Sequence, residues 1–132
     1  MVKFWSDNCD DGSYQIDKCV AGNDVTLSLD QIPQSFDVLI VATSSFGEGD
    51  PPANFLDFFL MLKRGLSSSA AHGTTPLKGL QHAVIGYGQS VYPTFQNCPR
   101  LTDKYLGKWA HAYQQLSART VASVVAAACR RW

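Results

Sequence analysis

Residues 36–54 read FDVLIVATSSFGEGDPPAN and carry the clearest fold signal in the chain. The stretch opens with an apolar run at 38–42 that is rich in β-branched residues and has no polar alternation. Such a run is typical of a strand buried on both faces, in a parallel sheet covered by helices. A loop with two glycines follows, and Asp50 and Pro51 then predict a helix start as N-cap and first-turn proline. Strand, loop and helix make half of a βαβ unit, in which ligands bind on loops of this kind.

The loop contains one aromatic residue, Phe46, among glycines and hydroxyl side chains. Two interpretations are open from this loop alone. Phe46 lays its ring against a flat ligand, or the loop is a plain turn with a buried phenylalanine.

The 132 residues suit a single domain, 1–132, with the composition of a globular α/β protein. No apolar run approaches the ~20 residues of a membrane span, and the first residues lack the layout of a secretory signal. The four cysteines form no CxxC pair and have no histidines at zinc spacing, so no metal site is expected. Free thiols in a cytoplasmic protein are the expected state.

The net charge of zero conceals an asymmetry. Residues 1–60 hold ten of the eleven acidic residues, with Lys3 and Lys18 as the only bases, and the remainder carries the opposite excess. Both groups can be solvated faces, or the acidic end can steer a basic partner. The basic half lacks aromatic interleaving and any nucleic-acid motif, so no nucleic-acid partner is expected.

Patterns along the rest of the chain predict alternating strands and helices. We expect strands at 2–6, 25–29, 83–86 and 121–126, a poor short helix within 13–22, and a helix over about 98–116. The clearest helix runs from Pro51 to about Arg64, with Gly65 as its stop. Its apolar residues fall on one stripe and are expected in the core: Phe55, Phe58, Phe59 and Leu62. This alternation predicts a doubly wound sheet.

The strand at 83–86 also runs into a loop of glycines and aromatics, GYGQSVYPTF. With this second loop, the chain resembles the FMN-binding, flavodoxin-like domain of the diflavin reductases. That family includes the microsomal cytochrome reductases, the reductase half of nitric oxide synthases and the sulfite reductase flavoprotein. The matching segments are TSSFGEGDPPANF at 43–55, PLKGL at 76–80 and AVIGYGQSVYPTFQN at 83–97. The resemblance covers roughly residues 36–106.

The resemblance implies a flavodoxin-like parallel sheet of order 2-1-3-4-5 with FMN at its top. Phe46 would cover one face of the isoalloxazine and Tyr92 the other, because offset aromatic stacking favours this arrangement. The peptide of Gly47 would meet the flavin N5. The cofactor-binding residues carried over are Ser44, Ser45, Phe46, Gly47, Asn54, Tyr87, Gly88, Gln89, Ser90, Val91, Tyr92, Pro93, Thr94, Phe95 and Gln96.

Two parts of the chain depart from the family pattern, at 1–25 and 110–132. No S-x-T-G-x-A phosphate loop follows the first strand, and the nearest candidate, residues 6–13, places three aspartates where the FMN phosphate would lie. The expected last strand, its acidic loop and the last helix are not recognisable. The sheet would then be incomplete at its first strand and its C-terminus, as in a truncated domain.

Two functions remain open. The first is an FMN-binding electron-transfer module that passes electrons from a flavoprotein reductase, which carries FAD and NADPH, to a haem or similar acceptor protein. The second is a degenerate flavodoxin-like fragment that binds no FMN and acts as an interaction domain. A free-standing quinone reductase would need a nicotinamide site, and a hydrolase would need a nucleophile motif, for which the sequence offers no residues. No catalytic residues are expected.

Overall fold

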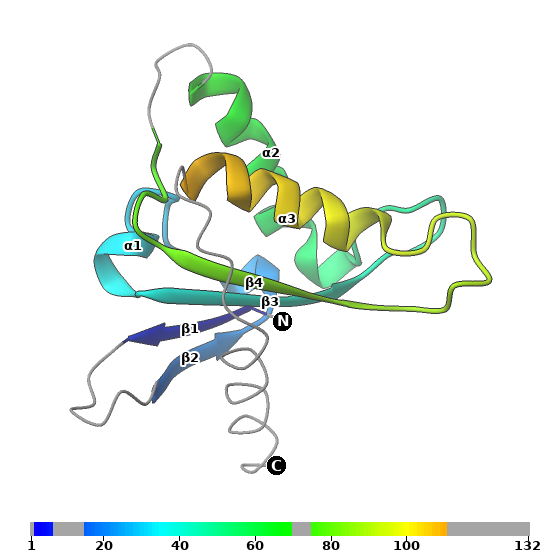
Figure 1. Ribbon diagram of the computed structural model, residues 1–132, viewed down its shortest axis with the longest axis horizontal. Helices are drawn as coiled ribbons and strands as arrows, with labels where there is room; N and C mark the ends of the chain where they lie inside the picture. The colour runs from blue at the N-terminus through cyan, green and yellow to red at the C-terminus, as the bar shows by residue number, and fades with distance from the viewer. Residues whose placement is uncertain (1, 7–14, 70–74, 111–132) are drawn as a thin grey trace.

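The computed structural model describes residues 2–6, 15–69 and 75–110 (Figure 1). The strands are β1 (Val2–Ser6), β2 (Gln15–Val20), β3 (Val38–Ser44) and β4 (Gln81–Tyr87). The helices are α1 (Ile32–Ser35), α2 (Leu56–Ser69) and α3 (Asn97–Ala110). Two short 3-10 turns, η1 (Gly22–Asp24) and η2 (Ala53–Phe55), precede α1 and α2.

The four strands form one sheet of order β2-β1-β3-β4. β3 and β4 are parallel, from Val38 opposite Gln81 to Ser44 opposite Tyr87, and α2 connects them. The predicted α/β fold is therefore confirmed, and the order of the sheet begins 2-1-3-4 as predicted, with residues 15–20 and not 25–29 as the second strand.

The direction of β1 differs from the all-parallel arrangement. β1 is antiparallel to both neighbours, with Val2 opposite Val41 and Trp5 opposite Val38. The physical reason is the length of chain between the first two strands. A parallel crossover needs a dozen or more residues, and only residues 7–14 connect β1 to β2. β2, β3 and β4 consequently share one direction and β1 opposes them.

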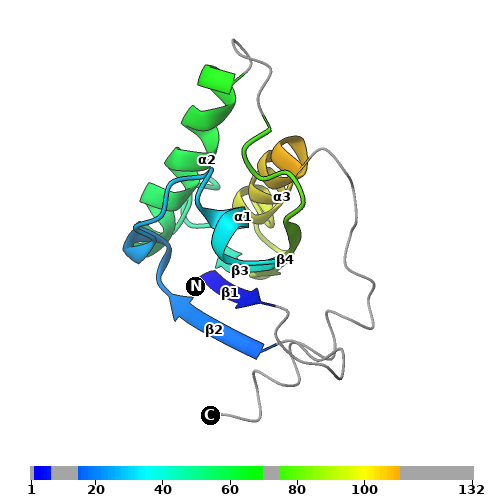
Figure 2. The ribbon, with the colours of Figure 1, turned by 90° about the vertical axis from the view of Figure 1, so that its left-hand side faces the viewer.

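Both long described helices pack on the same face of the sheet, α3 above β4 and α2 beside α3 (Figure 2). Alternate residues of β3, Leu39 and Val41, face these helices in the core. Val38 and Ile40 alternate with them on the opposite face and are also buried, so β3 is buried on both faces as predicted. The helices contribute Phe55, Phe58, Phe59, Leu62, Cys98 and Leu106 to the core.

Helix α2 confirms the predicted stripe and corrects the predicted bounds. Phe55, Phe58 and Leu62 are almost fully buried, and Phe59 packs its ring against Tyr105 of α3. The helix proper begins after the 3-10 turn η2 and continues through Gly65 to Ser69. Gly65 is therefore not its stop, because a glycine lowers helix propensity without enforcing an end.

Two predictions near the N-terminus are wrong. The segment expected as a poor helix contains strand β2, and the strand expected at 25–29 pairs with no other strand among the described residues. Val25, Leu27 and Leu29 nevertheless pack against the core at alternate positions. Alternation of apolar residues predicts which side is buried, and strand pairing also requires a free neighbouring edge.

Several predictions concern residues outside the described ranges: the strand at 121–126, the C-terminal part of the last helix, Cys9, Cys129 and the three aspartates of 6–13. Cys19 and Cys98 are free thiols. In the described part of the chain, no helix is long and apolar enough to cross a membrane.

Candidate functional site

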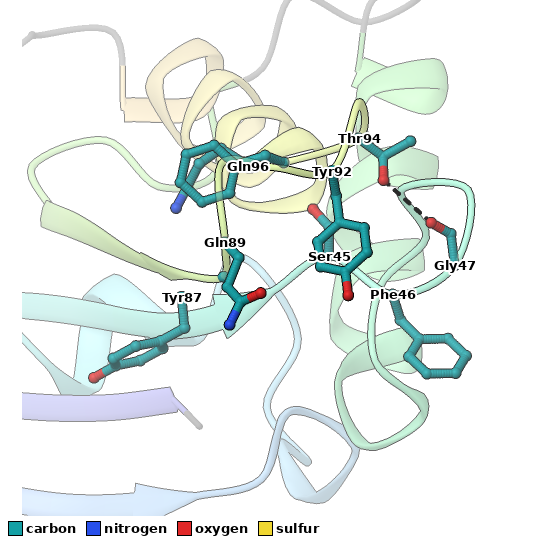
Figure 3. Close-up of a pocket in the computed structure, with 10 residues that line it drawn as sticks. Ser45, Phe46, Gly47, Tyr87, Gln89, Tyr92, Thr94 and Gln96 are labelled. Atoms are coloured by element: carbon teal, nitrogen blue, oxygen red, sulfur yellow. Dashed lines mark hydrogen bonds between the residues drawn. The ribbon is translucent and has the colours of Figure 1, made fainter.

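A pocket of about 500 Å³ lies where β3 and β4 end, between the loop that follows each strand (Figure 3). The carboxyl ends of parallel strands are the usual ligand position in open α/β sheets. Its lining consists of hydroxyl, amide, glycine and aromatic residues: Ser45, Phe46, Gly47, Tyr87, Gly88, Gln89, Tyr92, Thr94, Phe95 and Gln96.

The first loop is a tight turn that presents one ring to solvent. The backbone N–H of Phe46 donates to the carbonyl of Asp50 at 2.9 Å, and the N–H of Asp50 donates back to Phe46 at 2.8 Å. Gly47 and Gly49 have φ of 52° and 100°, which favours glycine at both positions. Phe46 is 75% exposed at the tip. The interpretation of this residue as a buried phenylalanine is therefore wrong.

Three more aromatic residues are exposed at the end of β4 and on the second loop, which folds through consecutive turns. The N–H of Tyr92 donates to Gln89, and the N–H of Phe95 donates to Tyr92 at 3.0 Å. Tyr87 and Tyr92 are largely exposed, and Phe95 less so. Gly88 has φ of 151° and leaves room for the Phe95 ring. Clustered exposed rings of this kind mark a binding surface more often than a structural one.

Three hydrogen bonds join the first loop to the second loop and to the start of α3. Thr94 Oγ1 donates to the carbonyl of Gly47 at 3.1 Å (Figure 3). Asn97 Nδ2 donates to the carbonyl of Gly49 at 3.0 Å, and the N–H of Cys98 donates to Ser45 Oγ at 3.0 Å. The pocket therefore has walls that are connected before any ligand is bound, which lowers the entropic cost of binding.

The arrangement suits the binding of an uncharged ring system. None of the residues that line the pocket carries a formal charge. Cys98 lies beneath the first loop, and burial raises the pKa of its thiol although hydrogen bonds with Thr43 and Thr102 act in the opposite direction. Its sulfur is thus neutral at physiological pH, unlike a reactive thiolate. The described residues contain no cluster of three or more His, Cys, Asp or Glu side chains suited to a metal ion.

The structure brings ten of the fifteen sequence-predicted cofactor residues to the pocket and leaves five outside its lining: Ser44, Asn54, Ser90, Val91 and Pro93. Asn54 lies in η2, and Val91 is 76% exposed. Direct contact of the ten with a cofactor stays a prediction.

Sequence reasoning missed three residues that hold the loops in place: Gly49, Asn97 and Cys98. Gly49 is buried, and a Cβ there would meet the Asn97 side chain. Asn97 is the last residue of the segment GYGQSVYPTFQN. The sequence feature that could have pointed to it is a side-chain amide directly after an aromatic loop. Only the folded structure shows that it faces the first loop.

A protein-family model described as "Flavodoxin" matches residues 13–127. The chain belongs to the flavodoxin family. This flavodoxin-family chain is 32% identical over 80 residues to "NADPH--cytochrome P450 reductase" of Musca domestica, a match that covers 61% of the chain and 10% of that protein. Among solved structures, oxidised flavodoxin 1 from Bacillus cereus gives a TM-score of 0.48 at 24% identity, covering 64% of this chain and 50% of that one.

FMN is the cofactor of the flavodoxin family, and the described pocket fits its ring system. The uncharged lining, the exposed rings of Phe46 and Tyr92 and the hydroxyl and amide groups between them suit a flat heteroaromatic ligand with polar edges. When bound, FMN supplies the electron-transfer chemistry. Ser45, Gly47 and Gln89 would orient it through hydrogen bonds.

The position of β1 bears on the phosphate of FMN. Because β1 is antiparallel to β3, its last residue, Ser6, lies toward the Val38 end of β3, at the edge opposite the pocket. The first residue of β2, Gln15, pairs with Ser6 at the same edge. A loop after the first strand therefore begins and ends away from the pocket, and the described lining offers no cation in its place.

Proposed function

We propose that this flavodoxin-family chain holds FMN between its two aromatic loops and acts as an electron-transfer module. The observation that carries the proposal is the pair of exposed rings, Phe46 and Tyr92, on loops that one hydrogen bond joins directly, with two further bonds from the start of α3 to the first loop. Exposed apolar rings gain free energy when a flat ligand covers them, by roughly 25 cal/mol for each Å² removed from water. Because hydrogen bonds already order the loops, little of this free energy is lost to the entropy of ordering them on binding.

The proposed electron donor is a flavoprotein reductase module with FAD and NADPH, and the proposed acceptor is a haem or similar redox protein. The similarity to the Musca domestica enzyme supports a redox partnership, and the chain spans about a tenth of that protein's length. The loops project from the sheet edge, so a partner can approach the flavin closely. Glu48 and Asp50 are exposed on the first loop and would steer a basic partner.

We place this activity in the cytoplasm, because a reducing compartment keeps cysteines as thiols. Cys19 and Cys98, the two cysteines within the described ranges, are both free.

A second candidate function is an interaction domain that binds no FMN. The specific observation in its favour is the reversed direction of β1, which places the end of β1 at the sheet edge opposite the pocket. The cross-loop hydrogen bonds favour the first candidate, because order in the loops before binding benefits a site that binds a ligand.

The test is a titration of the purified chain with FMN, followed by quenching of flavin fluorescence. The proposal predicts saturable quenching by wild type and weak quenching by the double variant Phe46→Ala/Tyr92→Ala, with circular dichroism showing that both are folded. The FMN-loaded chain is then photoreduced without oxygen and mixed with oxidised cytochrome c as a haem acceptor. Absence of quenching by the folded wild-type chain would favour the interaction domain. Quenching without cytochrome reduction would refute the electron-transfer role.

A further inference from the structure

The three hydrogen bonds between the loops differ in depth. The two made by Asn97 and Cys98 are partly buried, where α3 begins. The bond from Thr94 to Gly47 is exposed and is the outermost of the three. Of the three donors, Thr94 is the one nearest in sequence to Tyr92, and its acceptor, Gly47, directly follows Phe46. This bond therefore connects the backbone segments that carry the two exposed rings.

The space beside the Cα of Gly47 is open. Its φ is 52°, and a Cβ placed on it would have no neighbour within 4 Å. Glycine in open space has a wide choice of backbone conformations. The turn hydrogen bonds among Phe46, Gly49 and Asp50 set the path of the first loop, and the hydroxyl of Thr94 adds a hydrogen bond to the Gly47 carbonyl itself.

We propose that Thr94 is a positioning residue of the flavin site. Its hydroxyl holds the Gly47 carbonyl and thereby sets the separation between the Phe46 and Tyr92 rings before ligand enters. The inference rests on the proposed function for its ligand, and it assigns Thr94 a role through the loop and not through contact with the flavin.

The proposal differs from a purely structural role in what it predicts for two variants. Thr94→Val keeps the shape of the side chain and removes the hydroxyl, whereas Thr94→Ser keeps the hydroxyl and removes a methyl group. If the hydrogen bond is what matters, serine restores the wild-type behaviour and valine does not. If packing of the methyl group matters, the two variants exchange places.

The experiment measures hydrogen exchange in the ligand-free chain and flavin affinity in parallel. The reporting amides are Phe46, Gly49 and Asp50, which form the first-loop turn, and the reference amide is Gln81, which donates to Asp37 at the opposite edge. In Thr94→Val we expect about three- to tenfold faster exchange of the loop amides, the loss expected for one net hydrogen bond, and FMN binding weakened by a similar factor. Thr94→Ser should stay near wild type, and Gln81 should not change in either variant.

Each other result overturns the inference in a distinct way. Unchanged loop exchange in Thr94→Val would show that the bond does not order the loop. Faster exchange with unchanged FMN affinity would show that loop order does not set the ring separation. Failure of wild type to bind FMN would refute the proposed function and with it the role of Thr94 toward flavin, whereas the first two results leave the proposed function standing.

Discussion

The side chain of Gln96 fills the space beside Gly86, so that a Cβ at residue 86 would collide with the Gln96 amide. Gly86 lies near the end of β4, and Gln96 directly precedes α3 with φ of 62°. The absence of a side chain at residue 86 therefore lets the end of the second loop pack against β4.

Replacing Gly86 with alanine should destabilise the chain by less than the ~1–3 kcal/mol typical of overpacking, because the obstructing atoms are the end of the flexible, partly buried Gln96 side chain. Urea denaturation measures this loss. In the double variant Gly86→Ala/Gln96→Ala, the obstructing amide is gone, and the cost of the alanine at residue 86 should largely disappear. An equal cost with and without Gln96 would show that the strain lies elsewhere.

Removing either exposed ring should weaken FMN binding. Phe46→Ala and Tyr92→Ala should each cost roughly 1–3 kcal/mol of binding free energy, through lost stacking and buried area. Fluorescence titration gives the dissociation constants. The matched control is Val91→Ala, since Val91 is 76% exposed next to Tyr92 and lies outside the pocket lining. Unchanged affinity in both ring variants would contradict the stacking of FMN between Phe46 and Tyr92.

The phosphate of FMN should contribute little to affinity. The first strand ends at the edge opposite the pocket, and the described lining carries no cation. Riboflavin, which has the same ring and no phosphate, should therefore bind within about tenfold of FMN, a difference of about 1.4 kcal/mol. Competition of the two ligands in one titration measures the ratio. A much larger preference for FMN would reveal a phosphate site beyond the described lining.

His82 should make stability fall in mildly acidic solution. Burial lowers the pKa of His82, although the Asp103 carboxylate at 3.4 Å acts in the opposite direction. In the unfolded chain the pKa is about 6.5, so the unfolded state binds the proton more readily. The stability contributed by neutral His82 is complete above that pH and is lost as pH falls below it.

The matched variant for this effect is His82→Gln, which is polar and does not titrate. The free energy of unfolding, measured with urea, should fall in wild type relative to His82→Gln as pH falls below about 6.5. Asp103→Asn removes the interaction that raises the pKa, so NMR titration of the His82 ring should show a still lower pKa. A difference that is constant across this pH range would contradict the prediction.

The elements nearest the pocket could be predicted from the sequence because their signals are local. Two local patterns predict which surfaces are buried: the apolar run of β3, and the stripe of Phe55, Phe58 and Leu62. The two glycine- and aromatic-containing loops follow strands, and loops after parallel strands meet at one edge. Ten of the fifteen residues named from these loops line one pocket.

The direction of β1 could not be predicted in this way. A short apolar segment predicts a strand. The direction of that strand depends on the connection that the following residues form. Residues 15–20 show no regular alternation of apolar and polar side chains, so the sequence pattern does not predict their hairpin with β1. The cross-loop partners, such as Asn97 with Gly49, were equally hidden because they join residues 48 positions apart.

The hydrogen bonds between the two loops have a consequence for the folding of the chain. Thr94–Gly47, Asn97–Gly49 and Cys98–Ser45 join residues separated by 47, 48 and 53 positions, and none involves β1 or β2. Contacts of such separation form only after the intervening chain is ordered, which here means the pairing of β3 with β4 through α2. The pocket is therefore absent from any partly folded state that lacks this pairing. A flavin that binds the pocket selects the folded chain alone and raises its melting temperature in proportion to the logarithm of its concentration.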